Sequence, residues 1–431
     1  MQNIAITLFE SMVIRNYLFS DNCELLSKIA SQNKVILISN YKNLKFIEEC
    51  IETIDKKNIS LFVYKSQNIA FLLKICLSIL KWTNSSDTIL RDIKIEKKNR
   101  VLKFIANKVF SRFPLKDSIL RLLILKLFRQ NKFHHNIYSH HEKVSLPKLD
   151  VVFITSLSNQ SDDLQVALFA RRNRIKIIGT MRSWDNLSSH GGLALIPDVF
   201  YSHSMFMSQM LSQFHRLNKN ITVTLTAPNY RQNFLLSDRS NPKSILEPSI
   251  KIGYGCMGEH INPGEKEFLI KLNQIGELFS FYEFSIIQHP SFPHEIDFQL
   301  NSNLSVIQFD YTRVKLHSYY QSLTQLDVLI AGGSSILLDA VFVGTPIAYL
   351  NFEISKQDFW KSALRYYDTL NHTKKFIELG DPFTLNNEED LIKLLSGKEF
   401  DRLIMDRPKV EFFTGDSSIN LNAELIELIL N

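Results

Sequence analysis

The chain of 431 residues combines 45% hydrophobic and 22% charged residues with only 14 glycines, a composition that excludes disordered, collagen-like and coiled-coil proteins. Its four cysteines form no CxxC pair, and no run of 18 apolar residues occurs, so disulfide scaffolds, zinc knuckles and membrane spans are not indicated. The net charge of +6 is concentrated, because 13 basic and three acidic residues lie between Arg91 and Lys132. Such a block favours an anionic partner or a solvated helical face.

The sequence predicts a cytoplasmic protein of two domains. Met1–Phe9 lacks the basic flank that precedes the apolar stretch of a secretory signal, and isolated cysteines suit a reducing compartment. Since a domain takes roughly 150 residues, the length allows two or three folding units, of which we expect two.

In the first half of the chain, short β-branched runs alternate with stretches of helical periodicity. Helices are expected near Met12–Ser31 and over Asp163–Arg172. Strands that alternate with helices predict a parallel sheet, and ligands of such sheets lie beyond the carboxyl ends of the strands. The expected strands are Ile4–Phe9, Lys34–Ser39, Ile59–Tyr64, Val151–Thr155, Ile175–Gly179, Val199–Ser202 and Ile221–Leu225.

Residues 68–140 interrupt this rhythm. Leucine, isoleucine and phenylalanine recur there at three- and four-residue spacing between lysines and arginines, which predicts a basic helical insert. Four histidines near its end have no acidic or cysteine partners, so a solvated connector is favoured over a metal site, and no metal is expected. These histidines are His134, His135, His140 and His141.

A second α/β region follows the polar, proline-containing segment Ser237–Pro248, which we take as the linker. We therefore expect an N-terminal domain over residues 1–240 and a C-terminal domain over 249–431. The expected strands of the C-terminal domain are Ile250–Tyr254, Phe284–Gln288, Ser305–Phe309, Asp327–Ile330 and Pro346–Leu350. Its expected helices are Glu265–Gly276, His317–Leu323 and Ile336–Phe342.

The sharpest motif lies within Leu326–Phe352, where an apolar strand runs into a glycine-serine turn and a helix. Glycines let a backbone approach a ligand, and a helix N-terminus offers free N–H groups to a phosphate. Serines can cap that helix or donate to phosphate oxygens, so a plain strand-turn-helix with a serine cap is the alternative. The residues are Gly332, Gly333, Ser334 and Ser335, with Asp339 on the helix.

Two other turns follow predicted strands of the second domain. His289 and Pro290 end an apolar strand, and the proline holds the imidazole at the carboxyl edge, where it can reach a phosphate or ribose; a surface turn is the plain alternative. Gly253–Gly258, which includes Gly255, is a weaker glycine-rich turn that can approach a donor phosphate, and Glu259 and His260 follow it.

The HP turn and the downstream serine pair resemble the nucleotide-binding half of GT-B glycosyltransferases. The resemblance covers roughly Ile250–Phe352 and is closest to the branch of sialyltransferases and polysialyltransferases, Kdo transferases and CDP-glycerol glycerophosphotransferases. It implies that His289 with Pro290, and Ser334 with Ser335, contact the phosphate and ribose of a cytidine nucleotide. Many GT-B enzymes hold the ribose with a glutamate after the glycine turn, where this chain has Asp339.

In the first domain, polar side chains gather in the loop Gly179–Gly192. As chemistry, Asp185 can remove a proton from an acceptor hydroxyl, while Arg182 or His190 offsets developing phosphate charge. Equally, Asp185 and Asn186 can simply cap the following turn. The polar and aromatic residues of the loop are Arg182, Ser183, Trp184, Asp185, Asn186, Ser188, Ser189 and His190.

Two neighbouring features point toward the same region. Trp184 is costly to expose unless it contacts a ligand or the other domain, and the Ser-Trp-Asp-Asn string looks like a motif of bacterial surface-carbohydrate biosynthesis proteins. Arg15 and Asn16 follow the first strand, near where an acceptor would enter, although a surface salt bridge or a cap explains them equally well.

Together these features predict an α/β protein of the GT-B class, with two Rossmann-like domains facing each other across a cleft. The expected activity is that of a glycosyltransferase, moving a sugar from a CMP- or UDP-sugar to a surface polysaccharide, such as capsule or lipopolysaccharide, or to a lipid-linked acceptor. Since no DxD-type acidic pair lies near the motifs, we expect inverting, metal-independent transfer with no cofactor beyond the nucleotide-sugar co-substrate. The basic insert would attach the enzyme to the inner, anionic face of a bacterial cell membrane.

Three alternatives remain open from the sequence. Two are enzymes of the same fold, a CDP-glycerol-type polyol-phosphate transferase and a UDP-N-acetylglucosamine 2-epimerase-like enzyme, although an epimerase needs no membrane patch. The third is a noncatalytic GT-B scaffold in polysaccharide assembly. Nucleic acid is not an expected partner, because the insert carries aliphatic residues at helical spacing rather than interleaved aromatics and glycines.

Overall fold

The chain forms two compact units in the computed structural model. One comprises Met1–Asn233 with Gly415–Asn431, and the other Phe234–Thr414. The structure describes residues 1–18, 24–52, 54–65, 71–82, 116–130, 146–157, 162–215, 222–225, 250–258, 262–290, 292–308, 313–357, 370–397 and 421–430, with single residues between them. The expected linker 237–248, the four histidines of 134–141 and residues 259 and 260 lie outside these ranges.

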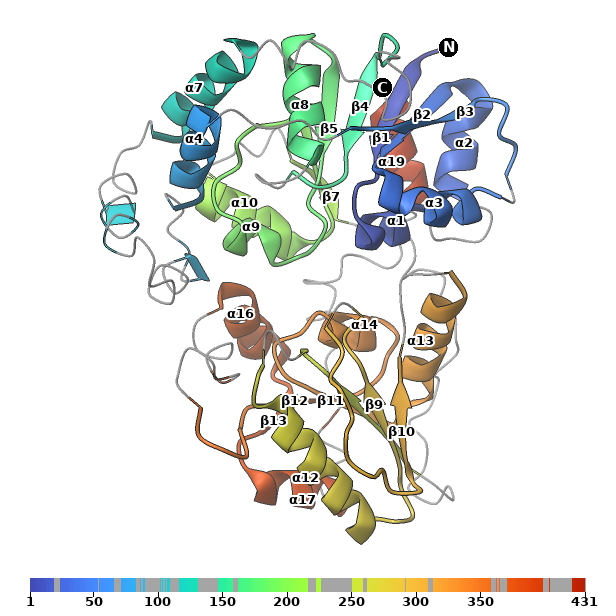
Figure 1. Ribbon diagram of the computed structural model, residues 1–431, viewed down its shortest axis with the longest axis vertical. Helices are drawn as coiled ribbons and strands as arrows, with labels where there is room; N and C mark the ends of the chain where they lie inside the picture. The colour runs from blue at the N-terminus through green and yellow to red at the C-terminus, as the bar shows by residue number, and fades with distance from the viewer. Residues whose placement is uncertain are drawn as a thin grey trace. The chain divides into compact units, whose positions relative to one another are not determined.

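The first unit contains a seven-stranded sheet whose strands are all parallel (Figure 1). The strand order 3-2-1-4-5-6-7 is that of a doubly wound sheet, and the order reverses between β1 and β4. In order across the sheet the strands are β3 (Ile59–Val63), β2 (Lys34–Ser39), β1 (Asn3–Thr7), β4 (Val151–Ile154), β5 (Lys176–Gly179), β6 (Val199–Ser202) and β7 (Thr222–Leu225).

Helices follow the strands of this sheet and bury its apolar side chains. Tyr17 packs edge-on against Phe153 at the centre of the core, and the ring centroids are 5.1 Å apart. The described helices of the unit are α1 (Ser11–Leu18), α2 (Glu24–Gln32), the 3-10 turn η2 (Tyr41–Asn43), α3 (Leu44–Cys50), α4 (Phe71–Trp82), α7 (Lys116–Gln130), α8 (Asp162–Arg172), α9 (Asn186–Ser189), α10 (Met205–His215) and α19 (Leu421–Leu430).

The last helix corrects the expected domain boundary. We expected the second domain to run to Asn431, but α19, red in Figure 1, packs on α2 in the first unit. Its residues Leu425 and Ile429 are fully buried in the first core. The apolar side of α19 packs against α2 and the core of the first unit, so the helix belongs to that unit.

The basic helical insert is confirmed in its described parts. Between β3 and β4 the chain forms α4 and α7, which pack against each other at one end of the unit in Figure 1. No described helix is both long and apolar enough to cross a lipid bilayer.

The second unit repeats the architecture with six parallel strands. The strand order 10-9-8-11-12-13 again reverses once, between β8 and β11. Across the sheet the strands are β10 (Leu304–Ile307), β9 (Glu283–Ile287), β8 (Lys251–Gly255), β11 (Val328–Ala331), β12 (Ile347–Leu350) and β13 (Phe383–Leu385). The described helices are α12 (Glu265–Leu278), α13 (Arg313–Gln325), α14 (Ile336–Phe342), α16 (Asn371–Gly380) and α17 (Glu388–Leu395).

The predicted alternation of strands and helices is therefore confirmed in both units. Several elements, including β2, β6 and α14, have the bounds expected from the sequence. The expected helical stretch near Met12–Ser31 is confirmed in its described parts, which form α1 and α2. Each unit thus places one reversal of strand order, the usual ligand position of such sheets, at the carboxyl ends of its two central strands.

Candidate functional site

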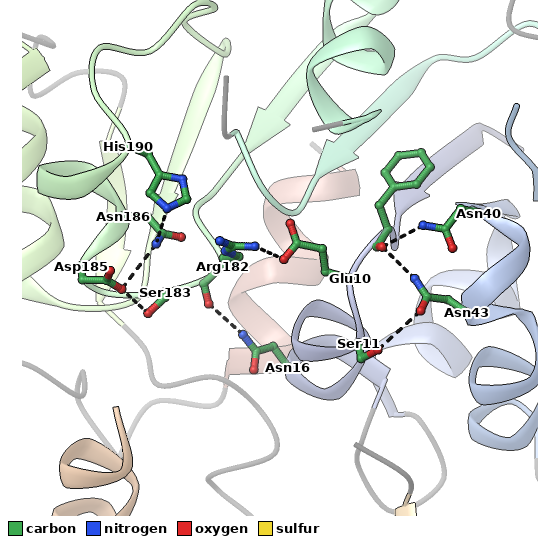
Figure 2. Close-up of polar contacts among 11 residues, drawn as sticks. Glu10, Ser11, Asn16, Asn40, Asn43, Arg182, Ser183, Asp185, Asn186 and His190 are labelled. Carbon is green, nitrogen blue, oxygen red and sulfur yellow. Dashed lines mark hydrogen bonds and ion pairs between the residues drawn. The ribbon is translucent and has the colours of Figure 1, made fainter. Parts of the chain in front are cut away.

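The first candidate site lies where the strand order of the first unit reverses. The turn after β1 carries Glu10, and the loop after β5 carries Arg182; the two side chains form an ion pair (Figure 2). The carbonyl of Arg182 accepts a hydrogen bond from Asn16 Nδ2 at 3.2 Å. Glu10 compensates the charge of Arg182. Their ion pair also connects the turn after β1 to the loop after β5.

Side chains that follow β2 fix the turn that carries Glu10. Asn43 Nδ2 and Asn40 Nδ2 both donate to the carbonyl of Phe9, at 2.7 and 3.0 Å, and Ser11 Oγ donates to Asn43 Oδ1 at 3.4 Å (Figure 2). The neighbouring Arg15 is buried and donates twice to Asn16 Oδ1, each time at 3.2 Å. Arg15 and Asn16 therefore support the Arg182 backbone from within the unit.

Asp185 is surrounded by hydroxyl and amide donors of its own loop. Its Oδ1 accepts from Ser183 Oγ at 2.5 Å and from Asn186 Nδ2 at 3.4 Å, and its Oδ2 accepts from Ser189 Oγ at 3.2 Å. The hydroxyls of Ser188 and Ser189 also donate to its carbonyl, each at 3.0 Å. Although Asp185 occupies the N-cap position of α9, its side chain forms no cap hydrogen bond to that helix, so these bonds hold the carboxylate within its own loop.

His190 completes the network shown in Figure 2. Asn186 Nδ2 lies 3.4 Å from His190 Nε2, so one amide links the histidine to Asp185. Burial lowers the pKa of His190, and the negative charge of Asp185 opposes this shift. A neutral imidazole near pH 7 is suited to accept a proton. It is less suited to offset phosphate charge, the role that the sequence analysis assigns to Arg182 or His190.

The remaining residues of the loop have packing partners. Trp184 is half-buried, and its ring lies 5.7 Å from that of Phe206 on α10. Gly191 has a φ of +82°, and a Cβ there would lie 2.4 Å from Lys81 Cα of α4. Gly192 donates to the carbonyl of Leu80 at 3.2 Å, so the two glycines let the loop lie directly on the basic insert.

A buried carboxyl group that the sequence analysis missed lies beside this site. Asp163, in the first turn of α8, accepts a hydrogen bond from Thr7 Oγ1 at the end of β1 and is fully buried. Thr155, after β4, donates to the Thr7 carbonyl at 2.5 Å. Asp163 Oδ2 has no hydrogen-bond partner among the described residues. Burial raises the pKa of Asp163 to about 8; the Thr7 hydrogen bond opposes the shift, and the charge of Glu10 adds to it.

In the second unit, His289 lies at the carboxyl end of β9, as the HP motif predicts. Its ring stacks on that of Phe292, with centroids 5.3 Å apart, and Pro290 beside it is half-buried. Burial lowers the pKa of His289, against the opposing effect of the Glu265 charge. The imidazole is therefore mainly neutral near pH 7 and offers a ligand a hydrogen bond rather than a charge.

Glu265, the first residue of α12, organises the turn after β8. Its carboxylate is fully buried and accepts from four donors. These are Tyr254 Oη at 2.8 Å, the backbone N–H groups of Met257 at 2.8 Å and Gly258 at 2.9 Å, and His294 Nε2 at 2.5 Å. The glycine-rich turn thus directs two of its amides to a protein carboxylate, and these amides are not available to a phosphate.

This turn also contacts the other two motifs of the unit. Gly258 has a φ of +92°, and a Cβ there would lie 2.7 Å from Phe292 O and 3.3 Å from His289 Cβ. A Cβ on Gly332 would lie 2.9 Å from Met257 Sδ. The structure therefore brings together His289 and the glycine-serine turn, on either side of residues 256–258.

The glycine-serine turn presents its hydroxyls at the edge of the sheet. Ser335 is exposed and Ser334 partly exposed, and neither hydroxyl has a hydrogen-bond partner among the described residues. Ser335 occupies the N-cap position of α14, yet its side chain forms no cap hydrogen bond. Gly333, between Gly332 and these serines, is partly exposed. The hydroxyls are free to bond a ligand.

Two other expected ligand contacts lie in the interior. Asp339 is buried, and its carboxylate accepts a hydrogen bond from Tyr319 of α13 at 3.3 Å. A Cβ on Gly255 would lie 2.8 Å from Ile336 Cγ2, so this glycine serves close packing of β8 against α14. Within the described residues, no group of three or more His, Cys, Asp and Glu side chains is arranged to hold a metal ion.

The sequence analysis missed four charged or titratable residues at these edges: Glu10, Asp163, Glu265 and His294. A signal existed for Glu10, since it directly follows the first strand. Asp163 and Glu265 each fall in the first turn of a predicted helix, where acidic residues are expected for the helix dipole alone. Their burial depends on tertiary contacts that no local pattern contains.

Solved structures with similar folds span both units. The glycosyltransferase of kitacinnamycin has a TM-score of 0.50 at 11% identity, covering 99% of this chain and 98% of that one. The putative UDP-N-acetylglucosamine 2-epimerase from Listeria monocytogenes has a TM-score of 0.51 at 12% identity, with 100% and 95% covered. The UDP-GlcNAc 2-epimerase from Neisseria meningitidis, bound to UDP-GlcNAc, has a TM-score of 0.51 at 10% identity, with both chains fully covered.

These likenesses establish the fold class. No protein-family model matches the sequence, and no curated protein has significant similarity to it. The expected GT-B class with two Rossmann-like domains is confirmed by the strand orders and by the structural neighbours. At 10–12% identity the comparison extends to the fold alone.

Proposed function

We propose that the protein is a glycosyltransferase that moves a sugar from a nucleotide-activated donor to a surface glycan or a lipid-linked acceptor. The observation that carries the proposal is the cluster at the strand-order reversal of the second unit. His289 and the hydroxyls of Ser334 and Ser335, which have no hydrogen-bond partner among the described residues, lie on either side of residues 256–258. These groups donate hydrogen bonds, as recognition of a phosphate and a ribose requires.

The donor site proposed here differs from the one expected from the sequence in one respect. Since Glu265 occupies the amides of Met257 and Gly258, the donor phosphate binds at the serines and His289 rather than at the turn after β8. A carboxylate already held in that turn also repels a second anion. Transfer then proceeds with inversion and without a metal, and the neutral His289 donates a hydrogen bond to the leaving phosphate.

On the acceptor side, the proposal assigns proton removal to Asp185 of the first unit. The Ser183, Asn186 and Ser189 hydrogen bonds hold this carboxylate in one orientation, as a positioned base requires. Glu10, paired with Arg182, is a second candidate base at this edge. Asp185→Asn is expected to abolish transfer while Glu10→Gln mainly weakens acceptor binding; the reverse result would make Glu10 the base.

The first experiment is a thermal-shift titration with CMP, CDP, UDP, GDP and ADP. A nucleotide that binds only the folded protein stabilises it by about 2.7 kcal/mol at 100 times its Kd. We expect one nucleotide to stabilise the wild type selectively and both His289→Ala and Ser335→Ala to lose most of this effect. Ser322→Ala is the matched control, because its hydroxyl donates to the Ser318 carbonyl within α13.

Binding of none of the five nucleotides would contradict the transferase proposal and favour a noncatalytic scaffold. The likeness to 2-epimerases makes epimerisation the second candidate function. Incubation with UDP-GlcNAc alone separates the two, since an epimerase forms the C2 epimer without any acceptor. A CDP-glycerol-type transferase would respond to CDP or CMP and transfer a polyol phosphate rather than a sugar.

A further inference from the structure

The two described helices of the insert expose apolar side chains on the faces opposite their buried stripes. In α4, Leu73, Cys76, Leu77 and Leu80 are buried, whereas Phe71 is 77% exposed. In α7, Leu120, Ile124 and Phe128 are buried, whereas Leu122 is 67% exposed. The exposed large apolar residues of the two helices are Phe71, Leu72, Ile75, Ile119, Leu122 and Leu123, which we call the apolar face.

Positive charge accompanies this apolar face. Lys126 follows Ile119, Leu122 and Leu123 at helical spacing and is exposed on the same stripe, and Lys74 is exposed on α4. In the sequence, Arg91–Lys132, which includes Lys126, carries a net charge of +10. Leucine and isoleucine flanked by lysines are the composition of a surface that enters the headgroup region of an anionic bilayer.

The insert is also joined directly to the loop that carries Asp185 and His190. Ser86 Oγ donates to the Ser188 carbonyl at 2.5 Å, and Arg121 Nε of α7 donates to the Leu193 carbonyl at 2.8 Å. Gly191 and Gly192 lie against the backbone of α4 at Leu80 and Lys81. Whatever the apolar face binds is therefore held close to the first candidate site.

We infer that the apolar face of α4 and α7 docks on an anionic lipid bilayer and holds the Asp185 loop at the membrane surface, where it meets a lipid-linked acceptor. Naming the acceptor rests on the proposed function; the docking itself does not. Aliphatic side chains enter the interfacial region while the lysines contact anionic headgroups. The helices lie on the membrane, since neither is long and apolar enough to span it.

Charge argues against the other occupants of such a face. A second copy of the chain would bring the same lysines and arginines together, and like charges repel. A nucleic acid would leave the exposed leucines and isoleucines without apolar partners. An anionic bilayer satisfies both components of the surface at once.

Vesicle flotation with the full chain tests this inference. Vesicles of phosphatidylcholine alone are compared with vesicles that also contain phosphatidylglycerol, at low and high salt. We expect binding to the anionic vesicles, weakened by salt. Ile75→Ser with Leu122→Ser should reduce binding by roughly tenfold or more, and Lys74→Ala with Lys126→Ala by about fivefold per lysine. Leu278→Ser, an exposed leucine of the second unit, is the matched control and should bind as the wild type does.

Three results would overturn the inference. They are a wild type that does not float with anionic vesicles, an Ile75→Ser, Leu122→Ser variant that floats as well as the wild type, and a concentration-dependent dimer in light scattering that the same variant abolishes. Circular dichroism of the variants checks that they fold. Because flotation needs no nucleotide and the nucleotide titration needs no vesicle, failure of one proposal is distinguishable from failure of the other.

Discussion

Within the described parts of the chain, each unit has a fully buried carboxyl group at the carboxyl edge of its sheet, Asp163 in the first and Glu265 in the second, and the two groups differ in their surroundings. Glu265 accepts hydrogen bonds from four donors, two of them backbone amides. Asp163 accepts a hydrogen bond from Thr7, and its Oδ2 has no partner among the described residues. The first carboxylate is compensated by its neighbours, whereas burial raises the pKa of the second to about 8.

Hydrogen bonds from donors favour the charged form of a carboxyl group, whereas burial disfavours it. The negative charge of Glu265 adds to burial in raising the pKa of Tyr254 well above its usual value, so the tyrosine stays protonated and donates. Asp163 instead keeps a proton of its own near pH 7. Glu265 fixes the turn after β8. Asp163 is a titratable group beside the first candidate site.

Removal of the Glu265 carboxylate is expected to have the largest effect. Glu265→Ala leaves four buried donors without an acceptor, and breaking a buried pair of this kind costs about 3 to 5 kcal/mol. Denaturant unfolding measures the loss. Glu265→Gln keeps the side-chain volume and one acceptor oxygen, so it should lose less. A Glu265→Ala protein within about 1 kcal/mol of the wild type would show that the four bonds contribute little.

Two glycines with positive φ, one in each unit, give the next comparison. Gly191→Ala places a Cβ against the backbone of Lys81 in addition to straining the turn, and should cost about 2 to 4 kcal/mol. Gly344 has a φ of +79° and nothing within 4 Å, so Gly344→Ala carries the strain alone, about 1 kcal/mol. Equal losses in thermal unfolding would mean that α4 moves away from the loop without cost.

The titration of Asp163 predicts how stability varies with pH. A pKa raised from 3.8 to about 8 means that the folded state holds a proton that the unfolded state releases, so this stability is present below pH 4 and lost as the pH rises toward 8. Wild type should therefore lose about 2 kcal/mol relative to Asp163→Asn between pH 6 and pH 8. Urea unfolding of both proteins at the two pH values measures the difference. Parallel stability curves would exclude a protonated Asp163.

The smallest effect is expected one residue beyond Glu265. Lys266 pairs with Asp297 on the exposed surface, where the Nζ to Oδ2 distance is 2.6 Å. Exposed ion pairs contribute little to stability, so Lys266→Ala should leave the unfolding midpoint unchanged within error. A clear destabilisation by Lys266→Ala would mean that the first turn of α12 is fixed from its surface as well as by the buried carboxylate.

The sequence predicts the strands and helices of the fold because each element has its own local spacing of apolar residues. The run KVILIS forms β2 at its predicted bounds, and α14 also begins and ends at its predicted residues. The strand ends then place His289 and the glycine-serine turn correctly at the edge of the second sheet. The hydrogen bond between Glu265 and His294, by contrast, joins residues 29 positions apart in the chain. Such partners are set by tertiary packing, which single-sequence periodicity does not contain.

The position of α19 has a consequence for the order in which the protein is made. The helix completes the core of the first unit but is encoded after the whole of the second. On the ribosome, the β1–β7 region must therefore wait, with the α2 surface uncovered, until the second unit has been synthesised. Exposed apolar surface of this kind promotes aggregation during that interval, and a fragment that ends before residue 415 leaves the surface uncovered.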